Sequence, residues 1–231
     1  ETFTLPRYVP LAGYSRRKGR PSTGVHDPVG VRALVIQQEQ VTAALVSCDL
    51  LVVDEHLFGA VRRRLIEQGW PNGFVLILAG THTHSGPGAY GTRFVEKISM
   101  GHFNPAIFEA LVEGIVAAIT RAQAAQQPAR SAYLTRRVDG VVKNRSNPHG
   151  LVDDELVVQA FYPLQGEAPF AVVVNFAAHP TTLGAWSTEL SGDYPGVIMQ
   201  EVERGSSGAT CLFFAGSVGD QAPVKSGSGF E

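Results

Sequence analysis

The chain has 231 residues, of which 44% are hydrophobic and 17% are charged, and this composition excludes an intrinsically disordered chain. Its 19 Lys and Arg residues nearly balance its 21 Asp and Glu residues, so the overall charge predicts neither nucleic-acid binding nor a broad attraction to anionic membranes. No apolar run reaches the roughly 18 residues that span a bilayer, and no signal peptide is visible after Glu1. The cellular compartment and the oligomeric state stay open.

Strands and helices are predicted in an irregular alternation along the chain. Apolar runs typical of buried strands cover residues 31–37, 41–48, 74–79, 156–162, 170–176 and 210–215. The first two of these runs are close enough to form a hairpin. Helix signals, in which a capping residue or a proline precedes an apolar stripe, occur at 54–68, 104–119 and 194–204.

These elements predict an α/β fold with a mixed, largely buried β-sheet that is flanked by helices. The ligand site of such a fold is expected at the C-terminal edge of the strands. A single domain is expected over residues 1–231. Its Gly/Ser-rich tail, 225–231, follows a strand and a turn, where an α/β fold normally supplies another helix. The domain is therefore expected to be truncated at its C-terminal end.

Two further features are predicted to be structural. Cys48 and Cys211 both lie in apolar runs, which favours two buried free thiols, although the sequence leaves a disulfide open. The basic cluster at 16–20 is predicted to be a solvated loop, because loops normally run over the surface.

The strongest local motif is the run Gly-Thr-His-Thr-His-Ser-Gly-Pro-Gly at 80–88, directly after the predicted strand 74–79. Residues two apart in an extended strand face the same side. His82 and His84 are therefore expected to present both imidazoles to one point at the C-terminal end of that strand. Neutral imidazole is a common zinc ligand. The alternative is a pair of hydrogen-bonded loop histidines.

A third histidine, His179, follows another predicted strand in the run Asn-Phe-Ala-Ala-His-Pro-Thr at 175–181. Pro180 favours an extended backbone at His179, and this ring is expected at the same edge of the sheet. Taken alone, such a histidine is more often a hydrogen-bonded core residue. Three histidines in two separate motifs, each at a strand end, favour a metal site.

Other polar residues lie in the remaining motifs. Asp193, in the run Ser-Gly-Asp-Tyr-Pro-Gly at a helix start, is either an N-cap or a residue that orients a ligand histidine. Arg145, in the run Lys-Asn-Arg-Ser-Asn, either stabilises an oxyanion or binds a polar head group, or else is a plain loop arginine. Asp220 lies in a Gly-rich turn after the strand 210–215 and is expected near the same edge.

The motifs occur along the chain in the order Thr-His-Thr-His-Ser-Gly-Pro-Gly, Asn-Arg-Ser, Asn-Phe-Ala-Ala-His-Pro-Thr, Ser-Gly-Asp-Tyr-Pro-Gly and Gly-Asp-x-x-Pro. With this order, the sequence resembles the neutral/alkaline, non-lysosomal ceramidases. The run Gly-Val-His-Asp-Pro at 24–28, followed by the apolar run at 31–36, is similar to the start of that family. The resemblance spans nearly the whole chain.

The resemblance implies a catalytic zinc that cleaves the amide bond of ceramide, giving sphingosine and a fatty acid. It implies His82 and His179 as zinc ligands, and His84 as a partner of the substrate or transition state. Arg145 is expected to line the site.

The sequence departs from the family pattern in two respects. Ala222 replaces the serine of the family's Gly-Asp-Val-Ser-Pro turn, and the family's remaining zinc ligands, a glutamate and a tyrosine, are expected beyond residue 231.

The sequence therefore predicts a zinc-dependent hydrolase of a linear N-acyl amide, with a small-molecule or lipid substrate. Metal-activated water would be the nucleophile, since it needs no serine. Asp193 is expected to support the metal ligands. One alternative, which Ala222 motivates, is a zinc hydrolase of a different, smaller N-acyl or ester substrate. Another is a non-catalytic metal- or lipid-binding homologue. Neither a nucleic-acid partner nor a transmembrane segment is expected.

Overall fold

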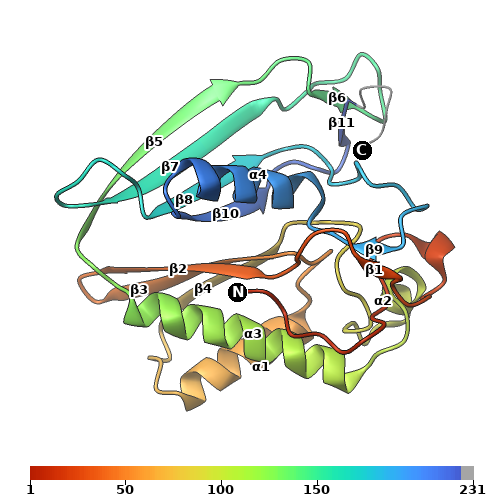
Figure 1. The fold of residues 1–231 in the computed structure, drawn as a ribbon, viewed down its shortest axis with the longest axis horizontal. Helices are drawn as coiled ribbons and strands as arrows, with labels where there is room; N and C mark the ends of the chain where they lie inside the picture. The colour runs from red at the N-terminus through yellow and green to blue at the C-terminus, as the bar shows by residue number, and fades with distance from the viewer. Residues whose placement is uncertain (225–231) are drawn as a thin grey trace.

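The structure is a computed structural model and describes residues 1–224. The tail at 225–231, and with it the expectation of a truncated domain end, lies outside the described residues. Two main β-sheets lie face to face, and helices cover the outer side of each (Figure 1). The layers therefore follow the order helix, sheet, sheet, helix.

The first sheet has the strand order β2-β3-β4. Its strands are β2 (Val31–Gln38), β3 (Val41–Cys48) and β4 (Val75–Gly80). The predicted hairpin is confirmed, since β2 and β3 pair antiparallel, whereas β3 and β4 pair parallel. Helices α1 (Glu55–Glu67) and α3 (Pro105–Ala124) pack against this sheet through the largest apolar cluster.

The second sheet has the strand order β10-β8-β7-β5. Its strands are β5 (Ala129–Arg137), β7 (Glu155–Pro163), β8 (Ala171–Phe176) and β10 (Thr210–Ala215). Strands β8 and β10 pair parallel, and the other neighbours pair antiparallel. Helix α4 (Asp193–Gly205) covers β8 and β10 on the side away from the first sheet.

Short elements complete the fold at the end where the site lies. They are the 3-10 turn η1 (Ser15–Arg17), β1 (Gly24–Val25), α2 (Phe94–Met100), β6 (Val142–Asn144), β9 (Glu189–Leu190) and β11 (Gln221–Pro223). Strand β1 pairs with β9, and β6 pairs with β11. Within residues 1–224, no single helix is long and apolar enough to cross a bilayer. Helices α2 and α3 together reach the required length and apolarity, but they are bent by 86° relative to each other.

The predicted mixed α/β class is confirmed, but its strands form two packed sheets rather than one. Leu34 and Leu45 of the first sheet meet Phe161 and Leu212 of the second in an apolar layer between them. The continuous apolar runs correctly indicated strands, and β8 and β10 are largely covered on both faces, whereas β4 leaves Val75 and Ile77 exposed. A run of this kind does not reveal whether the second cover is a helix or another sheet.

The capping residues predicted from the sequence mark the observed starts of α1 and α3. Asp54 caps α1 by accepting from the Leu57 amide at 2.7 Å, and Asn104 caps α3 by accepting from the Ala106 amide at 2.9 Å. Strand β5 was missed because each of its residues is exposed, so no apolar alternation marks it. The predicted free thiols are confirmed for Cys48 and Cys211, both of which are buried.

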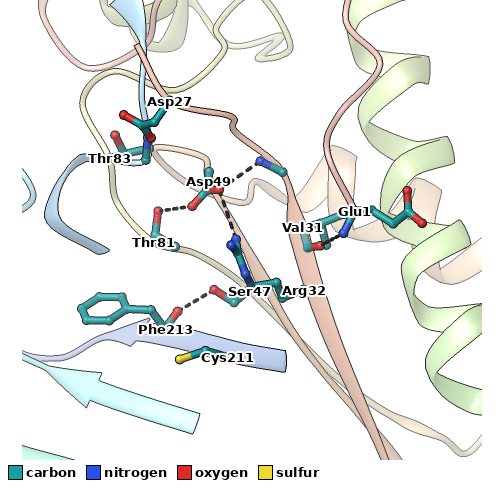
Figure 2. A network of polar contacts seen from close by, with 12 residues as sticks. Glu1, Asp27, Val31, Arg32, Ser47, Asp49, Thr81, Thr83, Cys211 and Phe213 are labelled. Atoms are coloured by element: carbon teal, nitrogen blue, oxygen red, sulfur yellow. Dashed lines mark hydrogen bonds and ion pairs between the residues drawn. The ribbon is translucent and has the colours of Figure 1, made fainter. Parts of the chain in front are cut away.

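A buried polar network joins the two halves of the fold (Figure 2). Arg32 on β2 donates to Glu203 on α4 at 2.7 Å and lies 3.6 Å from Asp49, the residue after β3. Asp49 also accepts from the Gly30 amide at 2.9 Å and from the Thr81 hydroxyl at 3.5 Å. Complete burial raises the pKa of Asp49 to about 6, although the Arg32 charge acts in the opposite direction.

The folded protein should lose stability as the pH rises through this range. Between pH ~4 and ~6 the folded state keeps the Asp49 proton, whereas the unfolded chain, with a pKa of 3.8, releases it. At about 1.4 kcal/mol per pKa unit, the penalty reaches about 3 kcal/mol at neutral pH. Asp49→Asn should abolish this slope in urea unfolding, and the exposed Asp139→Asn is the control. An unchanged slope in Asp49→Asn would contradict the assignment.

Candidate metal centre

Three histidines converge at one point between the two sheets. The ligand nitrogens of His82, His84 and His179 all lie within 4.8 Å of one another. Nε2 of His84 is 2.8 Å from Nε2 of His179, and the ring centroids of His82 and His179 are 4.6 Å apart. His82 and His84 follow the last residue of β4, and His179 follows β8. The site therefore combines the C-terminal ends of one strand from each sheet.

The backbone around His82 differs from the expected extended strand. Strand β4 ends at Gly80, and His82 adopts the left-handed region with φ of 67°. This turn is held by a hydrogen bond from the His82 amide to the Leu50 carbonyl at 3.0 Å. The rings of His82 and His84 do meet, with centroids 5.1 Å apart. They meet because of a tight turn rather than because of strand alternation.

Backbone carbonyls orient two of the three rings. Nδ1 of His82 lies 2.8 Å from the Leu51 carbonyl, and Nδ1 of His179 lies 2.8 Å from the Val218 carbonyl. A carbonyl only accepts, so each Nδ1 carries the proton and each Nε2 keeps a lone pair, which in His179 faces Nε2 of His84 at 2.8 Å. Among the described residues, Nδ1 of His84 is buried without a hydrogen-bond partner. The third ring is therefore not oriented in the same way.

All three imidazoles are held in their neutral form. Burial lowers the pKa of His82, His84 and His179, and it lowers that of His84 to about 3. Mutual repulsion and the Arg145 charge act in the same direction on His84. Neutral imidazole is the form that binds a metal ion. The donor set therefore fits a zinc ion, with room in the coordination shell for further ligands.

Arg17 connects the site to the N-terminal segment. Its guanidinium donates to the carbonyl of His84, to the Ser85 hydroxyl at 3.2 Å and to the Gly184 carbonyl at 3.3 Å. It also lies over the ring of Tyr14, whose centroid is 4.9 Å from that of His84. The prediction of a solvated loop is wrong for Arg17, which is only 6% exposed. No local pattern distinguishes this arginine from its exposed neighbours.

Asp193 is buried but makes no hydrogen bond to a histidine among the described residues. Its carboxylate accepts from the Thr182 amide at 3.2 Å, from the Thr182 hydroxyl and from the Leu183 amide at 2.9 Å. The N-cap of α4 is Gly192 rather than Asp193. Asp193 therefore stabilises the loop that follows His179, and any effect on that ring is indirect.

Arg145 lies near the histidines on an exposed turn. Its guanidinium donates to the Gly219 carbonyl at 2.6 Å, and its charge lowers the pKa of the three imidazoles. Asp220 instead accepts from the side-chain amides of Asn144 at 2.6 Å and Gln221 at 2.7 Å. Asp220 thus stabilises the turn, while Arg145 adds a second positive charge near the histidines besides that of Arg17.

The family model described as "Neutral/alkaline non-lysosomal ceramidase, N-terminal" matches residues 6–227. The chain belongs to this family. It is 30% identical to a neutral ceramidase of Pseudomonas aeruginosa over 96% of this chain and 36% of that protein. It is 28% identical to a neutral ceramidase of Mycobacterium tuberculosis over 87% of this chain and 34% of that protein.

Solved ceramidases share the fold of this family member. The crystal structure of the neutral ceramidase from Pseudomonas aeruginosa superposes with a TM-score of 0.88 at 28% identity, covering 99% of this chain and 39% of that chain. A structure of a ceramidase complexed with C2 gives a TM-score of 0.86 at 28% identity, covering 94% and 36%. The chain thus spans about a third of the length of these relatives.

Proposed function

We propose that this ceramidase-family chain forms the metal-binding part of a zinc-dependent hydrolase of linear N-acyl amides, with a ceramide-like lipid as its substrate class. Membership of the family supports the amide substrate. The observation that carries the proposal is the convergence of three neutral imidazoles at the ends of strands from both sheets.

His82 and His179 are the proposed zinc ligands. In each ring the Nδ1–H is engaged by a backbone carbonyl, which is how ligating histidines are commonly oriented in metalloproteins. His84 lacks such a partner among the described residues, which favours a different role. Resemblance to the family supports a glutamate and a tyrosine beyond residue 231 as the remaining ligands.

The other residues handle charge and protons in the proposed reaction. A bound zinc ion supplies Lewis acidity, which brings the pKa of water close to neutrality. His84 would exchange a proton with the reacting amide or donate a hydrogen bond to its oxygen. The positive charge of Arg145 would favour negative charge as it develops on that oxygen. Asp193 would keep the loop after His179 in place.

Ala222 excludes a covalent route through this position. Alanine has no hydroxyl, and a covalent mechanism needs an activated nucleophile within reach of a base. Ala222 lies on β11 opposite Lys143 of β6, in a short antiparallel pairing that Arg145 directly follows. Attack by water needs no side-chain nucleophile, so the proposed hydrolysis remains compatible with this substitution.

Chelation should abolish amidase activity of the full-length protein, and added zinc should restore it. The time course should show no burst of amine equal to the enzyme concentration, because no acyl-enzyme forms. Ala222→Ser is the matched control and should not introduce a burst. The readout is stopped-flow detection of the released amine. Activity that survives metal removal, or a stoichiometric burst in the wild type, would reopen the search for a nucleophile.

A second candidate is hydrolysis of a smaller N-acyl or ester substrate at the same metal centre, which Ala222 favours because it departs from the family. Comparing kcat/KM for short-chain and long-chain N-acyl amides and for matched esters separates the two candidates. A homologue that only binds would retain zinc and release neither amine nor alcohol. The substrate preference thus separates the two hydrolases, and the absence of any product identifies the homologue that only binds.

A further inference from the structure

Helix α2 presents an apolar face to solvent. Phe94, Val95 and Ile98 are 76%, 74% and 51% exposed, although they belong to an ordered helix. Their spacing places them on one side, because residues one and four positions apart span about a third of the helix circumference. Met100 points the other way and is buried in the core. The helix is thus anchored by one side and exposes large apolar side chains on the other.

A basic loop packs against the C-terminal end of this helix. The Gly13 amide donates to the Ser99 carbonyl at 2.9 Å. A Cβ atom on Gly19 would lie 2.9 Å from the Cα of Gly101, so the two backbones are in contact. This loop carries exposed Arg16, Lys18 and Arg20, while Lys97 is exposed on α2 itself.

Acidic groups reduce this positive charge at the N-terminal end of α2. Arg93 precedes α2 and lies 3.6 Å from Glu55, so it is not counted as a free cation. The Glu96 carboxylate accepts from the Arg93 amide at 2.7 Å and is partly buried. The net charge of the whole chain, −2, conceals this local concentration of positive charge. The basic cluster at 16–20 is visible in the sequence, but its position beside α2 is not.

The same loop also reaches the histidine cluster. Arg17, in the middle of the basic run, donates to the His84 carbonyl, and Tyr14 packs on the His84 ring. Figure 1 shows α2 at the same end of the molecule as β1 and β9. A flat partner that contacts α2 and the basic loop would therefore lie beside the metal centre.

We propose that Phe94, Val95 and Ile98, together with the basic residues Arg16, Lys18, Arg20 and Lys97, form a docking surface for an anionic lipid bilayer. Large apolar side chains beside Lys and Arg are the combination that binds the headgroup region of anionic membranes. Charge complementarity favours an anionic bilayer over an apolar protein partner, because an apolar protein would gain nothing from these four basic residues. Docking brings the histidine cluster to the surface in which a lipid amide resides.

Sedimentation with vesicles tests the proposal on the full-length protein. Binding to vesicles that contain phosphatidylglycerol should exceed binding to pure phosphatidylcholine, and it should weaken as salt screens the charges. Phe94→Ser/Val95→Ser/Ile98→Ser should weaken binding by about tenfold or more, because three apolar side chains that would insert into the bilayer are lost. The control triple variant changes apolar residues exposed elsewhere: Val41→Ser/Leu151→Ser/Leu164→Ser. It should bind like the wild type.

A second pair of variants tests the charges. Arg16→Gln/Arg20→Gln should weaken binding by about 30-fold, from about 1 kcal/mol per basic residue near an anionic surface. Arg63→Gln/Arg136→Gln removes the same charge from other exposed positions and should have little effect. The vesicle-binding assay can also be run on protein treated with a chelator, because vesicle binding does not depend on turnover.

Two results would overturn the proposal. The first is equal binding by the α2 variant and the wild type; a loss of thermal stability in that variant would then indicate that protein covers the α2 face. The second is equal binding to neutral and anionic vesicles. Failure of amide hydrolysis leaves both readouts unaffected, so the two proposals fail separately.

Discussion

Replacing either His82 or His179 by alanine should remove bound zinc and with it amide hydrolysis. Each ring offers Nε2 to the common point, while its Nδ1 is held by a carbonyl at 2.8 Å. Alanine offers no ligand atom, so the ion loses a donor from an ordered set. We expect kcat/KM to fall by about 1,000-fold or more, which corresponds to about 4 kcal/mol of transition-state stabilisation.

Metal analysis and amidase assays on the same preparations measure this effect. His149→Ala is the matched control, because it removes an exposed histidine outside the cluster. Thermal unfolding without added metal distinguishes ligand loss from misfolding. Full retention of zinc by either variant would contradict the ligand assignment. Loss of zinc with unchanged turnover would contradict the metal mechanism instead.

His84→Ala should reduce turnover while zinc content stays close to that of the wild type. The ring of His84 touches His179 through Nε2 at 2.8 Å, but its Nδ1 has no carbonyl partner among residues 1–224. Such a ring is free to act on the substrate rather than to hold the ion. A lost proton-transfer or oxyanion partner typically costs about 100- to 1,000-fold in kcat. The effect should appear in kcat, with little change in KM.

His84→Gln separates the two possible contributions of this side chain. Glutamine keeps a hydrogen-bond donor but cannot exchange a proton, so partial recovery of kcat would assign an oxyanion role to His84. No recovery would assign proton transfer. If His84→Ala loses zinc as completely as His82→Ala does, then His84 is a ligand and the roles proposed for the cluster are wrong.

Residue patterns along the chain were enough to predict the elements that have a clear apolar face. The stripe after Asn104-Pro105 became α3, and the two runs that end at Cys48 became the β2–β3 hairpin. The three histidines were also identified from their motifs. Local patterns suffice here because capping and burial are decided by residues that are close in sequence. Strand β5 and the short α2 lack such a signal and were missed.

The sequence by itself determined the three longer helices, the strands that have a clear apolar pattern, the family resemblance and the candidate histidines. Only the tertiary structure decided that the strands form two packed sheets, that His82 lies in a left-handed turn, and that Arg17 is buried beneath the site. The physical reason is the same in each case. The type of a residue indicates whether it tends to be buried. The residues that it contacts come from a distant segment, and they meet it only after the sheets have packed.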